Sequence, residues 1–198
     1  MEQVRSFVAI ELQPTLVDAL KRIQMQLKRQ RSANAVRWVT PDSTHLTLPF
    51  LGDVSSDRLA SIGDAIRQGC KGHAPFRIHL SALGCFPSPH RARVLWVGLE
   101  GDTAKLGLLQ QDIVSRLQQI GFAPESRPFQ PHLTLGRVKD SARPEERLEM
   151  ATSAQHIKFP PAEMTVHEVA LMRSKLTPSG AVYSQLAAIA LSQAEPLR

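Results

Sequence analysis

Residues 44–51 read THLTLPFL and residues 131–137 read PHLTLGR, so the tetrapeptide His-Leu-Thr-Leu occurs twice in one chain. The alternation of polar and apolar side chains is typical of a β-strand with one buried face. We expect the Leu side chains of each strand to pack against helices, which leaves His and Thr on the opposite face. If two such sheets face one another, both histidines and both threonines converge on one cleft.

The hydrophobic pattern predicts the same order of elements around both motifs. From Arg5 to His45 is 40 residues and from Arg93 to His132 is 39, which indicates a β-α-β-α-β unit used twice. Strands are expected at 5–12, 44–51, 76–83, 93–99, 132–138, 164–174 and, after a turn at Pro178–Gly180, at 181–190. Four helices are expected. The first covers 14–28, the second runs from a cap at Ser56 or Asp57 to Ile66, the third runs from a cap at Asp102 to Ile120, and the fourth covers 145–154.

No low-complexity linker separates the two halves, so they are expected to pack as one bilobal body. A basic loop is expected from Lys28 to Arg37, directly before the first motif strand. Pro49 follows the first motif and is expected to shorten the pairing of its strand.

The composition is that of a globular protein with a preference for anionic partners. Apolar residues make up 42% of the chain and charged residues 21%, and the formal net charge is +6. Cys70 and Cys85 lack metal-binding spacing and are expected to be core thiols, which suits a reducing compartment. The longest apolar run, Leu186–Leu191, is far shorter than the about 20 residues of a membrane span. We therefore expect a cytoplasmic protein without membrane contact.

The motif residues are those that metal-free phosphodiester chemistry requires. Near neutral pH, one of His45 and His132 can accept a proton from water while the other, protonated, donates to a leaving oxygen. The hydroxyls of Thr47 and Thr134 suit hydrogen bonds to the non-bridging oxygens on which negative charge accumulates. In-line attack at phosphorus needs an acid and a base on opposite sides, which two related lobes would supply. The residues alone leave open which histidine is the acid.

Other positions support weaker hypotheses. A zinc site would need three or four ligands, and neither motif has a Cys or carboxylate at ligand spacing. Arg137 could contact a phosphate, but strict alternation places it on the Leu face unless Gly136 introduces a bulge. The remaining histidines lack a Thr two residues later and are expected at the surface or in packing: His73, His79, His90, His156 and His167.

Basic and aromatic residues near the motifs could contact RNA, but a structural role is favoured for each. His90, Arg91 and Arg93 are expected to form a solvated loop rather than an RNA groove. Phe7, Trp38 and Phe50 could stack a base, but core packing is the preferred interpretation.

The sequence resembles the two-histidine (2H) phosphoesterases, and within them the bacterial and archaeal RNA 2′,3′-cyclic phosphodiesterases, formerly called 2′-5′ RNA ligases. The resemblance runs through RSFVAIEL (5–12), RWVTPDSTHLTLPFLG (37–52), RVLWVGL (93–99), PHLTLGR (131–137) and LMRSKLTPSGAVY (171–183). It implies an α+β, bilobal, LigT-like fold in which two pseudo-symmetric β-α-β-α-β lobes carry antiparallel sheets that face a central cleft. Residues 1–198 would form a single domain, with His45 in one lobe and His132 in the other.

The resemblance also implies hydrolysis of a 2′,3′-cyclic phosphate at an RNA end to a 2′-phosphate, without a metal or organic cofactor. Transferred by motif position, His45 is the proton donor to the leaving 3′ oxygen and His132 is the base that activates water. Thr47 and Thr134 would hold the phosphoryl oxygens, and Arg137 is a further candidate for substrate binding.

Two other functions stay open at this point. The same acid and base, run in reverse, would join a 5′-hydroxyl to the cyclic phosphate and form a 2′-5′ linkage. An RNA-end binding module with lapsed catalysis is the third hypothesis. The expected partner is RNA with a 2′,3′-cyclic phosphate end, a group that transfer RNA fragments and small cyclic nucleotides also carry, and the expected oligomeric state is a monomer.

Overall fold

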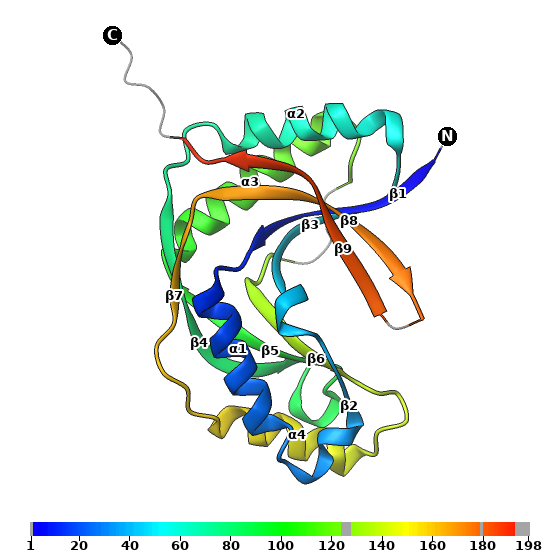
Figure 1. Ribbon diagram of the computed structural model, residues 1–198, viewed down its shortest axis with the longest axis vertical. Coiled ribbons are helices and arrows are strands. Elements are labelled where there is room, and N and C mark those ends of the chain that lie inside the picture. Colours follow the sequence, from blue (N-terminus) through cyan, green and yellow to red (C-terminus); the bar gives the residue numbers. More distant parts are fainter. Residues whose placement is uncertain (1, 124–127, 179, 193–198) are drawn as a thin grey trace.

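The computed structural model describes residues 2–123, 128–178 and 180–192. Its strands form two antiparallel sheets, which confirms the predicted α+β class (Figure 1). The His45 sheet has the order β3 (His45–Ser55), β1 (Gln3–Glu11), β8 (Glu168–Thr177) and β9 (Gly180–Ala190). The His132 sheet has the order β2 (Val36–Trp38), β6 (His132–Val138), β5 (Val94–Gly101), β4 (Phe76–Phe86) and β7 (Glu163–Val166).

Each sheet takes strands from both halves of the sequence. Strand β4 belongs to the first half but pairs with β5 of the second half, and β8 of the second half pairs with β1. The single strand predicted at 164–174 is two strands, because β7 pairs with β4 in one sheet and β8 pairs with β1 in the other. The two halves therefore interlock by exchanging their third strands.

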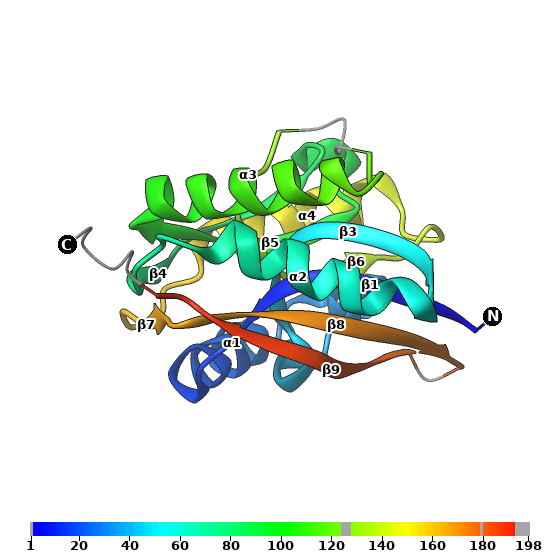
Figure 2. The same cartoon turned by 90° about the horizontal axis from the view of Figure 1, so that it is seen from above.

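The helices are exchanged in the same way. Helices α1 (Pro14–Leu27) and α4 (Pro144–His156) pack with the His132 sheet, whereas α2 (Leu59–Cys70) and α3 (Thr103–Gln119) pack with the His45 sheet (Figures 1 and 2). Apolar residues at helical spacing are buried: Leu16, Leu20, Ile23 and Leu27 in α1, and Leu106, Leu109, Ile113 and Leu117 in α3. Ile120, also expected on the inward face, follows the end of α3 and is half-buried.

The predicted helix caps are wrong. Residues Ser56–Arg58 form a 3-10 turn, and α2 begins after it without a capping side chain. Asp102 precedes α3, but its carboxylate accepts the main-chain N–H of Arg77 at 3.1 Å and pairs with Lys105 at 3.2 Å. Asp102 thus ties the end of β5 to the start of β4 instead of capping the helix.

Two irregular stretches beside the first motif also differ from the prediction. The expected loop from Lys28 to Arg37 contains a 3-10 helix at Arg31–Ala35, and its end lies in the edge strand β2, which is too short to show a period. Pro49 does not shorten its strand. Strand β3 continues to Ser55, and the pairing with β1 absorbs the proline through register shifts.

Both cysteines are free thiols, as expected. Cys70 is buried and Cys85 is half-buried. Burial raises the pKa of the Cys70 thiol to about 12, so this thiol is protonated at neutral pH. In the described part of the chain, no helix is long and apolar enough to cross a lipid bilayer.

Candidate active site

The two motif strands come from different sheets and contact each other where the sheets meet (Figure 1). The Leu side chains of both motifs are buried, as their alternation predicted: Leu46 and Leu48 on β3 and Leu133 and Leu135 on β6 are each at most 3% exposed. The histidines and threonines of both motifs alternate with these leucines and are half-buried. The motifs therefore present His and Thr on the faces turned away from the helices.

The two motif histidines make the same main-chain contact. The Nδ1 atom of His45 lies 3.2 Å from the carbonyl oxygen of Ser43, and Nδ1 of His132 lies 2.7 Å from that of Gln130. Because a carbonyl only accepts hydrogen bonds, each Nδ1 carries the hydrogen. Nε2 is then the ring atom that can take up or release a proton in both histidines.

Aromatic rings surround His45. Its ring centroid lies 4.6 Å from that of Phe7 and 4.8 Å from that of Tyr183, which stands edge-on. Burial lowers the pKa of His45 below its ordinary value of 6.5, and the hydrogen bond to Ser43 opposes this shift only in part. The neutral imidazole is therefore favoured at His45 when no anion is bound.

His132 has a different pair of aromatic neighbours. Its ring stands edge-on to Phe86 at 5.1 Å between centroids, and the ring of Trp96 lies 6.4 Å away. Tyr183, Phe86 and Trp96 were missed at the sequence level. They come from β9, β4 and β5, and no local pattern marks a residue whose partner lies on a strand distant in the chain.

The two histidines line two separate hollows. The hollow of His45 has a volume of about 280 Å³ and includes Tyr183, whereas the hollow of His132 measures about 590 Å³ and includes Phe86 and Trp96. None of the described residues lines both hollows. That both rings act on one phosphorus atom stays a prediction.

A bulge in β6 decides the direction of Arg137. Trp96 pairs with Thr134 and Leu95 pairs with Gly136, so Leu135 is the additional residue. Beyond the bulge the alternation is inverted: Val138 is buried and Arg137 is exposed. Arg137 therefore lies on the same face of β6 as His132, which is the arrangement that a bulge at Gly136 would produce.

The aromatic residues near the first motif have different environments. Phe7 is buried and Trp38 is half-buried, in line with core packing. Phe50, also expected in the core, is instead 44% exposed, and the guanidinium of Arg5 lies 4.6 Å from its ring centroid.

The residues outside the motifs show no metal-binding arrangement: within the described ranges, no group of three or more His, Cys, Asp and Glu side chains could hold a metal ion. His73 instead contacts Asp112 at 2.8 Å, and His79 lies 3.8 Å from Glu100.

Comparison with known proteins agrees with the fold. A sequence model of the 2′-5′ RNA ligase superfamily matches residues 11–177. An RNA 2′,3′-cyclic phosphodiesterase of Methanothermobacter thermautotrophicus is 38% identical over 185 residues, which cover 93% of this chain and 97% of the relative. The crystal structure of a Thermus thermophilus protein superimposes with a TM-score of 0.77 at 28% identity, covering 97% of this chain and 100% of that chain. The crystal structure of E. coli LigT in apo form gives a TM-score of 0.74 at 27% identity, covering 98% of this chain and 100% of that one. The chain belongs to the 2′-5′ RNA ligase superfamily.

Proposed function

We propose that this protein hydrolyses RNA 2′,3′-cyclic phosphate ends to 2′-phosphomonoester ends by acid–base catalysis with two histidines and no metal. The observation that carries the proposal is the matched pair of Nδ1 contacts, to Ser43 and to Gln130, which leaves Nε2 of both His45 and His132 available for proton transfer. The relatives named RNA 2′,3′-cyclic phosphodiesterase support the choice of substrate.

In this mechanism Nε2 of His132 accepts a proton from water, and the water oxygen attacks the phosphorus atom. The bond from phosphorus to the 3′ oxygen breaks, and Nε2–H of His45 donates its proton to that oxygen. The products are a 2′-phosphate and a free 3′-hydroxyl. His45 ends neutral and His132 ends protonated, so one proton must exchange with solvent before the next turnover.

The lowered pKa of His45 fits the role of proton donor. A group with a lowered pKa is a stronger acid once it is protonated, and it transfers its proton more readily to an alkoxide leaving group. The bound cyclic phosphate carries a negative charge, which favours the imidazolium form of a nearby histidine. Substrate binding would thus charge the donor immediately before it acts.

Three further side chains would hold the phosphoryl group. We assign Thr47 and Thr134 the role of hydrogen-bond donors to the non-bridging oxygens. Arg137, on the same face of β6 as His132, would add a charge-assisted hydrogen bond. Because the histidines come from different lobes, we propose that residues 1–198 act as a single bilobal domain and as a monomer.

The test is a turnover assay on an oligoribonucleotide that ends in a 2′,3′-cyclic phosphate, with the product analysed by mass spectrometry. A gain of one water and a product that resists a 3′-specific phosphatase would identify the 2′-phosphate. Activity is expected to survive EDTA; a loss that added metal restores would contradict the metal-free mechanism. A product with a 3′-phosphate would reverse the assignment of the leaving oxygen.

The same site can run the reaction in reverse, and the name of the superfamily supports this second candidate. An oligonucleotide with a free 5′-hydroxyl would then attack the cyclic phosphate and form a 2′-5′ linkage. Adding such an oligonucleotide to the assay separates the two directions, and we expect hydrolysis to dominate because water is present at far higher concentration. Turnover of either kind would exclude a binding module with lapsed catalysis.

A further inference from the structure

Three arginines line one hollow at the end of the His132 sheet. Arg37 on β2 stands directly opposite Arg137 on β6, and Arg137 in turn stands opposite Val94 on β5, which Arg93 precedes. We call Arg37, Arg137 and Arg93 the arginine row. Like charges directly opposite one another in an antiparallel pair repel, because their Cβ atoms are only about 4.5–5.5 Å apart.

The charge of the row has no salt bridge in the described part of the chain. Repulsion between like charges that stand side by side without a salt bridge lowers the stability of a sheet. An anionic ligand bound between them would remove this repulsion.

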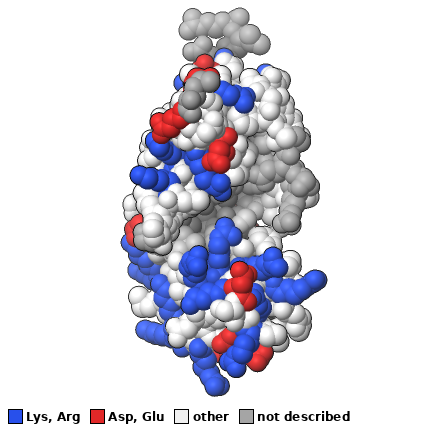
Figure 3. Space-filling model, turned by 90° about the vertical axis from the view of Figure 1, so that its right-hand side faces the viewer, with Lys and Arg blue, Asp and Glu red and all other residues white. Residues whose placement is uncertain are grey.

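The row borders two connected hollows of about 630 and 580 Å³, which share Arg93, Val94 and Asp140. Lys and Arg gather on this part of the surface, over the half of the molecule that holds the His132 sheet (Figure 3). Among the described residues that line the two hollows, Asp140 is the single acidic one. The cationic side chains that line them are Arg37, Arg91, Arg93, Arg137, Lys139 and Arg147.

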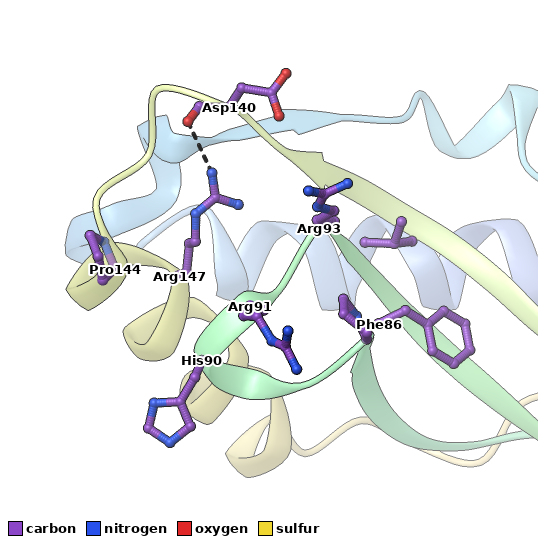
Figure 4. Close-up of a pocket in the computed structure, with 9 residues that line it drawn as sticks. Phe86, His90, Arg91, Arg93, Asp140, Pro144 and Arg147 are labelled. Carbon is purple, nitrogen blue, oxygen red and sulfur yellow. Dashed lines mark hydrogen bonds between the residues drawn. The ribbon is translucent and has the colours of Figure 1, made fainter.

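Arg147 joins the two loops at this surface by hydrogen bonds. Its guanidinium donates to the carbonyl of Asp140 at 3.1 Å (Figure 4). It also donates to the carbonyl of Lys139, after β6, and to that of Ala92, in the loop before β5, each at 2.8 Å. The two loops that flank the hollow are thereby fixed relative to each other. Since these partners are neutral carbonyls, the positive charge of Arg147 adds to that of the row.

Phe86 connects the basic surface with the candidate active site. It lines both the 630 Å³ hollow and the hollow of His132, and its ring stands edge-on to that of His132 at 5.1 Å between centroids. A chain with its end at His132 can therefore continue past Phe86 onto the arginines. Several cations along one path suit a polyanion better than a single phosphate.

We infer that Arg37 and Arg93, on either side of Arg137, bind backbone phosphates of the nucleotides that precede the cyclic end of an RNA chain. The inference rests on the proposed function, because it takes the reacting end to lie at His132. Phosphate contacts of this kind position the substrate without reading its sequence. The protein then prefers an oligoribonucleotide with a cyclic end over a mononucleoside 2′,3′-cyclic phosphate.

The test compares Arg37→Gln/Arg93→Gln with Arg22→Gln/Arg116→Gln, a control that removes the same charge from exposed positions on α1 and α3. Both variants are assayed on a trinucleotide with a 2′,3′-cyclic end and on a mononucleoside 2′,3′-cyclic phosphate. For the row variant we expect kcat/KM to fall about 10- to 100-fold on the trinucleotide and less than about threefold on the mononucleotide. Two contacts to a single strand, at about 0.7 each, should make the slope of log KM against log salt shallower by about 1.4.

Equal losses on both substrates, or no loss on the trinucleotide, would overturn the inference. The row variant is also expected to melt at or above the Tm of the wild type, because a repulsive pair is removed; a merely structural role would lower its Tm. Binding of a fluorescent trinucleotide that ends in a 2′-phosphate, measured by anisotropy, needs no turnover. If the wild type cleaves neither substrate, the proposed function fails. If the row variant binds the fluorescent trinucleotide as tightly as the wild type, the phosphate contacts are refuted, whatever the outcome of the turnover assay.

Discussion

Gly136 on β6 lies so close to Val36 on β2 that a Cβ at position 136 would stand 2.6 Å from Cγ1 of Val36. The same Cβ would stand 3.1 Å from the carbonyl oxygen of Arg37, which cannot move aside as a flexible side chain can. The bulge that turns Arg137 to the face of His132 thus depends on a residue without a side chain, packed against the neighbouring strand.

Gly136→Ala is therefore expected to lower the free energy of unfolding by about 1–3 kcal/mol through overpacking. It should also lower kcat/KM on the cyclic-phosphate substrate, because the strand must shift and Arg137 shifts with it. Urea denaturation and a turnover assay measure the two effects. Gly63→Ala is the matched control: its Cβ meets nothing within 4 Å, and inside a helix Ala is more stable than Gly by about 0.5–1 kcal/mol. A Gly136→Ala variant as stable and active as the wild type would refute the packing argument.

The two histidines give the most direct prediction. His45→Ala and His132→Ala should each lower kcat by about 10²–10⁴-fold, because each removes one proton-transfer step from the same reaction. Both side chains are only half-buried, so circular dichroism should report a folded protein in each case. His156→Ala is the control, since His156 is exposed and its side chain hydrogen-bonds to the carbonyl of Thr152 within its own helix. Near-full turnover by either motif variant would end the assignment of that histidine.

The environment of His45 predicts a pH dependence of stability. Burial lowers its pKa in the folded protein below the ordinary value of 6.5, so below that pH the unfolded chain binds more protons than the folded one. The contribution of His45 to stability is therefore complete above pH 6.5 and is lost as the pH falls toward its folded pKa. Denaturation curves at a series of pH values should show this slope in the wild type and a smaller slope in His45→Gln.

NMR titration of the histidine ring protons checks the same shift directly. His45 should titrate below 6.5 in the free protein, and its pKa should rise when a nucleoside 2′-phosphate is added, because a bound anion favours the imidazolium ion. A titration of His45 at or above 6.5 in the free protein would show that the ring is more hydrated than its neighbours Phe7 and Tyr183 suggest.

The motif strands could be predicted from the sequence because their chemistry is local. Alternation alone placed Leu46, Leu48, Leu133 and Leu135 in the core, and the predicted strand 132–138 has the observed bounds. Helix α1 was equally clear, because Pro14 marks its first residue and its apolar side chains recur at helical spacing.

What the sequence did not reveal depends on pairing between distant segments. The pattern of 76–83 predicts a strand, but nothing in it distinguishes β5 from β1 as its partner. The same applies to Tyr183, whose contact with His45 joins β9 to β3, and to the arginine row, which exists only because β2 pairs with β6. Arg137 was a conditional prediction for the same reason, since its direction is set by packing at Gly136.

A buried amide ties the first helix to the second motif. Gln24, 2% exposed on α1, donates from Nε2 to the carbonyl oxygen of Leu135 at 2.9 Å and to that of Val39 at 2.6 Å. These carbonyls belong to β6 and to the segment after β2, so α1 fixes the edge of the sheet beside the bulge.

Gln24→Leu keeps the side-chain volume but leaves both carbonyls without this donor, which should lower the free energy of unfolding by about 1–3 kcal/mol. Gln26→Leu, two residues away, removes a single exposed hydrogen bond to Lys158 and should change stability by less than about 0.5 kcal/mol. Equal stabilities of the two variants in urea denaturation would mean that water replaces the amide of Gln24 at no cost, and that α1 does not fix the position of β6.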